Sequence, residues 1–118
     1  MTKRNRHWYR GLLVAALSAP LCVSASVPTL SDCLEASDFI ANAALSRDNG
    51  MTRDAFINRL TGDFAAIRAF PAELRWFVRD EDDERFLEHA AEHVFDVPLT
   101  AADHRREFLQ ACFERLTI

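Results

Sequence analysis

The chain has 118 residues, of which 49% are hydrophobic and 27% charged, and its formal net charge at pH 7 is −4. This length suits one domain. The sequence contains no glycine-rich phosphate loop, no G-x-S-x-G elbow and no C-x-x-C pair, which excludes the enzyme classes built on those motifs. We therefore expect a non-catalytic protein that uses no cofactor.

Residues 1–25 have the three-part pattern of a secretory signal peptide. A basic start precedes the apolar run 12–17, and Val23 and Ala25 are small residues at positions −3 and −1 of a cleavage site. Cleavage there leaves residues 26–118 as a single helical domain, in the periplasm or outside the cell. An uncleaved anchor would need about 20 apolar residues. A lipoprotein would need a small residue directly before Cys22, so we expect no stable membrane anchor.

Removal of the signal peptide makes the remaining chain strongly acidic. Residues 26–118 carry 10 Arg, no Lys and 18 Asp and Glu, a formal net charge of −8. Phosphate binding needs clustered basic side chains, so nucleic acid and anionic lipid are not expected partners. The charge would suit a basic partner, and it also serves plain solubility.

Two cysteines, Cys33 and Cys112, remain after cleavage. An even pair in an exported chain predicts a disulfide. A reactive thiol or a shared metal is the alternative, which the absence of close cysteine spacing disfavours.

A first helix is predicted with Ser31 or Asp32 as its cap and Glu35 placed to complete a capping box, and apolar periodicity continues it. The helix ends before Gly50, which can adopt a positive φ. Its expected buried face is Cys33, Ser37, Ile40, Ala41, Ala44 and Leu45. Thr52 caps a second helix with the clearest apolar stripe, formed by Phe56, Ile57, Leu60, Phe64 and Ile67.

Pro71 ends the second helix and can begin a short helix over residues 72–79. A third helix follows from about Asp80 to Asp96, with Phe86, Leu87, Ala90, Ala91 and Val94 buried. Thr100 caps a last helix whose buried side is Ala101, Phe108, Leu109, Cys112, Phe113 and Leu116. The predicted fold is all-α, a small four- to five-helix bundle stapled by one disulfide.

The segment from His89 to His93 reads H-x-x-E-H, the zinc motif of inverted metalloproteases. Only 25 residues follow His93, too few for that family's further acidic ligand, so a protease is excluded. Two interpretations stay open. One is a solvated helix face, and the other is a surface metal site of His89, Glu92 and His93.

Two other segments have competing interpretations. The acidic run 80–84 could hold calcium, but it lacks the glycine and ligand spacing of an EF-hand and suits a helix N-terminus. Trp76 and Phe77 are adjacent, so a helix cannot easily bury both. Either one of them is exposed as part of an interface, or both are buried in a groove between helices.

Several features together resemble a group of short, uncharacterised, periplasmic all-helical proteins of Gram-negative bacteria with an N-terminal and a C-terminal cysteine. The features are Cys33, an Ala-rich first helix ending in Arg47 and Gly50, Val94-Phe95 with Pro98, and Phe108 with Cys112. The resemblance implies fold and compartment only.

Three functions follow as expectations. The first is a non-catalytic periplasmic protein that binds a protein partner, as an inhibitor, an immunity-type protein or an envelope accessory factor. The second is a metal-binding domain, and the third is an acid-stress chaperone whose many carboxylates become neutral at low pH.

Overall fold

The computed structural model describes residues 28–116, and this part of the chain contains helices and no strand. The α-helices are α2 (Leu30–Asp48), α3 (Arg53–Ile67), α4 (Glu81–Asp96) and α5 (Ala101–Leu116), and η2 (Ala72–Leu74) is a 3₁₀ turn. The predicted all-α class is therefore confirmed. The predicted signal peptide lies outside the described residues. None of the described helices is long and apolar enough to cross a membrane.

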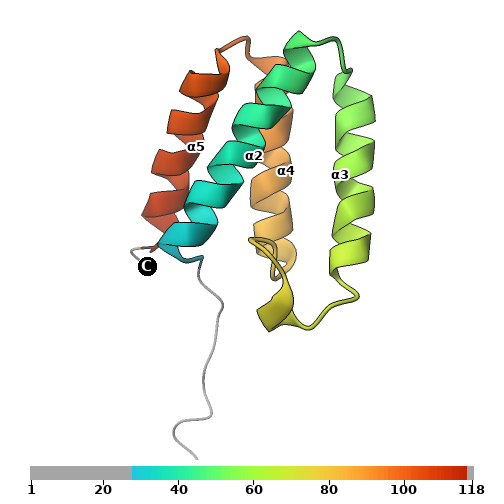
Figure 1. The fold of residues 1–118 in the computed structure, drawn as a ribbon, viewed down its shortest axis with the longest axis vertical. Helices are drawn as coiled ribbons and strands as arrows, with labels where there is room; N and C mark the ends of the chain where they lie inside the picture. Colours follow the sequence, from blue (N-terminus) through green and yellow to red (C-terminus); the bar gives the residue numbers. More distant parts are fainter. Residues whose placement is uncertain (1–27, 117–118) are drawn as a thin grey trace, which may run out of the picture.

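Successive α-helices of the described residues run in alternating directions, so α2 and α5 lie antiparallel (Figure 1). α2 packs against both α5 and α4, and α3 packs mainly against α4. The order across the bundle is therefore α5, α2, α4 and α3, with α3 at one edge (Figure 1).

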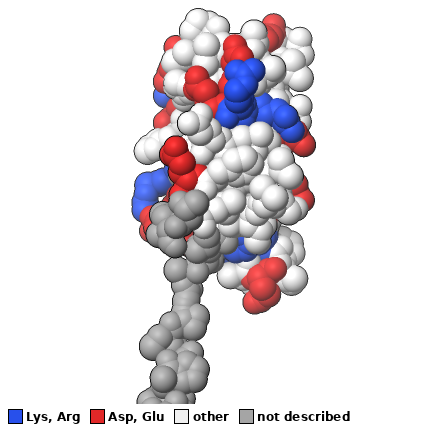
Figure 2. All heavy atoms as spheres, turned by 90° about the vertical axis from the view of Figure 1, so that its left-hand side faces the viewer, with Lys and Arg blue, Asp and Glu red and all other residues white. Residues whose placement is uncertain are grey.

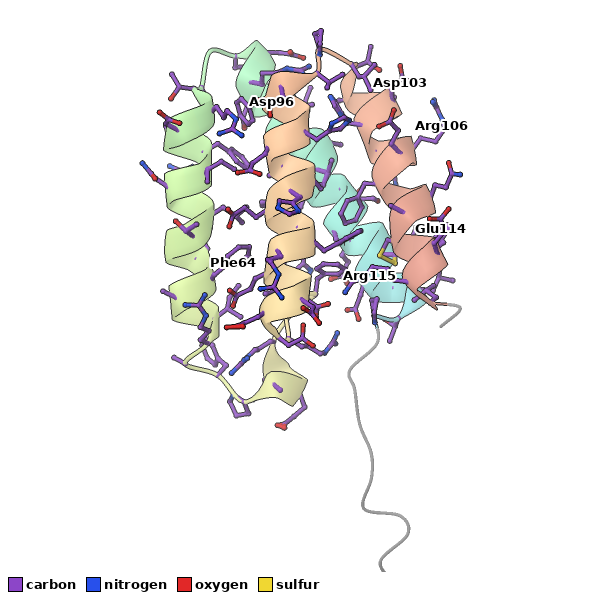
Figure 3. All side chains as sticks on the ribbon, turned by 180° about the vertical axis from the view of Figure 1, so that it is seen from behind. Phe64, Asp96, Asp103, Arg106, Glu114 and Arg115 are labelled. Carbon is purple, nitrogen blue, oxygen red and sulfur yellow. A yellow bond between two sulfur atoms is a disulfide. The ribbon has the colours of Figure 1, made fainter. Side chains whose placement is uncertain are left out.

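The predicted disulfide joins Cys33, near the start of α2, to Cys112, near the end of α5. The two Cα atoms lie 5.8 Å apart, and both cysteines are fully buried. The sulfur–sulfur bond lies between α2 and α5 when the bundle is viewed from behind (Figure 3). The bond closes a loop that spans 79 positions and contains α3 and α4.

A side-chain cap begins each of the four α-helices within residues 28–116. Thr52 and Thr100 accept hydrogen bonds from the first turns of α3 and α5, as predicted. α2 differs from the prediction because Thr29, not Ser31 or Asp32, is its N-cap. The capping box is completed by Asp32 rather than Glu35. Gly50 follows α2 with φ +100°, which confirms the predicted positive φ.

The buried faces of α2 and α5 are rotated from the predicted ones. α2 buries Cys33, Ser37, Ile40 and Ala44 as predicted, together with Asp32, Ala36 and Ala43. Leu45 is 50% exposed. Because α2 contacts two helices, small side chains on a broad face allow both to approach. α5 buries Phe108 and Cys112 with His104, and it leaves Phe113 exposed.

The predicted helix over residues 72–79 is wrong beyond its first turn. After η2 the chain is irregular, and Arg75 donates to the carbonyl oxygens of Arg68, Phe70 and Arg79. These bonds satisfy backbone acceptors on both sides of the irregular segment. The irregular path lets neighbours Phe77 and Val78 both enter the core, where they are 0% and 1% exposed.

Two buried carboxylates, Asp32 and Asp83, accept hydrogen bonds from arginines at the end of the bundle where α2 and α4 begin and α5 ends. Asp32 Oδ2 accepts from Arg79 Nη1 at 2.8 Å, and Asp83 Oδ1 accepts from Arg115 Nη2 at 3.0 Å. Burial alone would raise the pKa of Asp32, but hydrogen bonds from Arg79 and Thr29 and the charge of Arg79 outweigh it and lower the pKa. Burial is also the main cause of the raised pKa of Asp83, which its hydrogen bonds offset only in part.

Replacing Asp32 by asparagine is expected to destabilise the protein at pH 7 by about 1–2 kcal/mol, because a charged acceptor at a helix N-terminus is lost. The pKa of Asp32 is lower in the folded chain than in the unfolded chain. Its contribution is therefore present above the ordinary pKa of an aspartate and is lost as the pH falls through the folded value. Urea unfolding at pH 7 and pH 3 checks this. The difference between wild type and Asp32→Asn should shrink at pH 3, and an unchanged difference would contradict the assignment.

Candidate functional site

A pocket of about 270 Å³ opens between α4 and α5. Four of its lining residues are polar: His89, His93, His104 and Glu107. The other five are apolar: Ile40, Phe86, Ala90, Phe108 and Ala111. This volume is slightly below the range for small-molecule sites, about 300–1,000 Å³. The pocket therefore suits an ion with its water, or a small molecule.

Three of the polar side chains form a cluster that joins the two helices. His93 comes from α4, and His104 and Glu107 lie one turn apart on α5. One ligand atom from each lies within 4.8 Å of the others. His93 Nε2 is 3.3 Å from Glu107 Oε1, and the two imidazole rings meet edge to face with centroids 5.4 Å apart.

His104 is 2% exposed and has a defined partner on one side of its ring. Its Nε2 lies 2.9 Å from the carbonyl oxygen of Val97. A carbonyl only accepts, so Nε2 carries the proton and donates it. In the neutral ring, Nδ1 is then the nitrogen with an unprotonated lone pair. The Val97 bond thus fixes both the tautomer and the ring.

Arg47 borders this cluster and binds the connection between α4 and α5. Its guanidinium donates to the carbonyl oxygens of Val94 at 2.7 Å and Leu99 at 2.8 Å, and more weakly to Val97 at 3.3 Å. Nη1 also lies 3.4 Å from His104 Nε2. The positive charge faces the peptide carbonyls at the end of α4, where a cation is favourable.

The structure does not bring together the three residues of the predicted metal site. His89 and His93 both line the pocket. Glu92 lies instead toward α3, where its carboxylate is 3.7 Å from Arg53 Nη2. The cluster that the structure brings together thus contains His93 from the predicted set, with Glu107 where the prediction had Glu92. His104 and Glu107 were missed, although a histidine on an apolar face with a glutamate three positions later is a visible signal.

Trp76 and Phe77 do not form the exposed pair that was one of the two predicted alternatives. Phe77 is completely buried, and its ring contacts those of Phe86 and Phe108 with centroids 6.1 Å apart. Trp76 is half-buried against Phe39, and its indole Nε1 donates to Glu35 Oε1 at 3.0 Å. The interface interpretation is therefore wrong for Phe77, and the groove-filling interpretation is correct for it.

A second surface feature lies along the outer side of the seam between α2 and α5. Arg105 Nε donates across this seam to Asp38 Oδ1 at 3.0 Å, which fixes the side on which both residues lie. The two helices are antiparallel, so moving backward along α2 from Asp38 and forward along α5 from Arg105 leads in the same direction in space. The residues one and two turns away along each helix therefore lie on the same side as the ion pair. They are Leu34 and Leu30 on α2, and Leu109 and Phe113 on α5.

These four residues define what we term the outer face. Leu30, Leu34 and Phe113 are 56%, 43% and 37% exposed, and Leu109 is partly buried. Leu109 and Phe113 also line a shallow groove with Arg106, Gln110 and Glu114. Figure 2 shows an uncharged area in the middle of this side of the molecule, with charged side chains above and below it. Three of the six exposed large hydrophobic side chains in the described part of the chain thus belong to this face, and the other three are Leu45, Phe70 and Leu74.

The fold and these two surfaces define a disulfide-stapled helical protein with a histidine-lined pocket and an apolar outer face. No protein-family model, no curated protein and no solved structure matches the chain.

Proposed function

We propose that the protein is exported by its N-terminal segment, resides in the periplasm or outside the cell, and acts without catalysis by binding a protein partner. The observation that carries this proposal is the outer face, where Leu30, Leu34, Leu109 and Phe113 gather on two adjacent helices. Apolar surface bounded by charge is typical of protein interfaces. Membership among the short periplasmic helical proteins of Gram-negative bacteria is part of the same proposal.

The disulfide supports this proposal because it holds the two helices of the outer face together. Cys33 is one residue from Leu34, and Cys112 is one residue from Phe113. A surface that is rigid before binding loses less conformational entropy when the partner arrives. The net charge of −8 over residues 26–118 would attract a basic partner and speed the encounter.

A photocrosslinking experiment in the producing cells tests the proposal. We expect benzoylphenylalanine at Phe113 to give one discrete adduct with another protein. The adduct should be recovered from the periplasmic or secreted fraction, with Ser26 as its first residue. The matched control is the same amino acid at Ala65, an exposed position on α3. The control should give only background.

A surface variant separates binding from folding. Leu34→Ser adds polarity on the outer face without emptying the core, and we expect it to remove the Phe113 adduct while leaving the unfolding curve nearly unchanged. Equal crosslinking from Phe113 and Ala65 would contradict the proposal. So would an adduct of twice the mass of the chain, because that result would show self-association.

A further inference from the structure

We infer that the pocket between α4 and α5 binds one divalent transition-metal ion of the zinc class through His93, His104 and Glu107. Neutral imidazole and carboxylate are ligands that zinc accepts, and two histidines with one glutamate form a known set for an open zinc site. The inference concerns a different surface from the outer face. It also differs from the set His89, Glu92 and His93, because the structure turns Glu92 toward α3.

The distances in the cluster fit a metal ion after small movements. With zinc–ligand bonds of about 2.0–2.2 Å, two ligands of a tetrahedral ion lie about 3.3 Å apart. His93 Nε2 and Glu107 Oε1 are already 3.3 Å apart, and one possible ligand atom from each of the three residues lies within 4.8 Å of the others. The small movements needed to bring the ligands closer would be made by His93 and Glu107, because their side chains are 47% and 56% exposed.

His104 has the supporting bond that metal-binding histidines use. Such a histidine donates its other ring N–H to a backbone carbonyl or a carboxylate, which fixes the ring and strengthens the ligand. His104 Nε2 lies 2.9 Å from the Val97 oxygen, which leaves Nδ1 as the ligand atom. Because His104 is almost completely buried, the ion would have one rigid ligand and two adaptable ones.

The residues around the cluster affect how tightly the metal ion would bind and how many ligands it would have. Arg47 lies 3.4 Å from His104 Nε2 and repels a cation, which the carboxylate of Glu107 opposes. The guanidinium of Arg47 is also paired with Asp48, at 2.9 Å. Three protein ligands leave a fourth position of a tetrahedral ion for water or a small anion, and the pocket beside the cluster provides the room.

Calorimetry with zinc chloride on the untagged, oxidised protein tests the inference. We expect one Zn²⁺ per chain. His93→Ala and Glu107→Gln should each weaken binding by more than about tenfold, since a change in the second shell alone costs that much. Both residues are exposed, so the variants should fold. Glu92→Gln is the matched control and should bind as wild type does.

Nitrogen NMR of the His104 ring gives a second measurement that needs no variant. Zinc should shift the Nδ1 signal, while the Nε2 proton stays on the bond to Val97. Each of these results would overturn the inference: no binding at one ion per chain, equal weakening by Glu92→Gln and Glu107→Gln, or a shift at Nε2 instead of Nδ1. Cobalt in place of zinc should give the absorption of a tetrahedral ion, and its absence would count against the site in the same way.

Discussion

Replacing Cys33 by serine is expected to lower the free energy of unfolding by about 4.5 kcal/mol, the chain-entropy value for a loop of this length. The bond spans 79 positions, so its loss lets the unfolded chain explore far more conformations. Small domains are stable by only about 5–15 kcal/mol in total. The variant should therefore be close to unfolded at physiological temperature, as judged by urea unfolding and circular dichroism.

The control for this prediction is the second cysteine. Cys112→Ser should cost the same as Cys33→Ser, and the double variant should cost little more than either single one, because all three lack the same bond. Reductant should reproduce the effect in the wild-type protein. An unfolding curve that reductant leaves unchanged would contradict the prediction.

Replacing Arg47 by methionine should destabilise the protein by about 3 kcal/mol, although no apolar contact is lost. The guanidinium donates to the carbonyl oxygens of Val94 and Leu99, which lie at the end of α4 and in the loop before α5. Without Arg47 these acceptors lose a charged donor that is 18% exposed. We expect hydrogen exchange to accelerate first in the α4–α5 connection and the first turn of α5.

Arg53→Met is the matched control for Arg47→Met. Arg53 makes an ion pair with Asp96 on the surface, at 2.9 Å, and exposed pairs of this kind contribute little. Its removal should leave the unfolding curve almost unchanged. If the two arginine variants were equally stable, the carbonyl contacts of Arg47 would have no structural role.

Local signals predicted much of this fold. The stripe of Phe56, Leu60 and Phe64 and the cap Thr52 depend on residues within one helix, and the structure confirms them. The disulfide was predictable because the expected cleavage after Ala25 would leave only two cysteines to pair. Helix caps and short periodicities are encoded within a few positions, so a sequence shows them directly.

The wrong prediction of a helix over residues 72–79 has a different cause, which is contact between residues distant in the sequence. The irregular path of residues 75–79 is stabilised by hydrogen bonds from Arg79 to Asp32 and from Trp76 to Glu35. These pairs are 47 and 41 positions apart. No local pattern reveals such contacts. A strong start signal at Pro71 therefore predicted a helix that tertiary packing interrupts.

The candidate metal site was half predictable for the same reason. His93 belongs to a recognisable pattern on α4, but its partners lie on α5. His104 was overlooked because histidine on an apolar face does not strengthen a hydrophobic stripe. Its burial depends on the carbonyl oxygen of Val97, seven positions earlier, which no periodicity indicates.

The position of the disulfide also determines how the molecule responds to tension. A force that pulls on the two ends of the chain passes directly from Cys33 to Cys112 through covalent bonds. Only the residues outside that bond, 1–32 and 113–118, can be drawn out, and the helices between the two cysteines carry no load. A protein-threading machine that grips either terminus must therefore take two strands at once, or reduce the bond first.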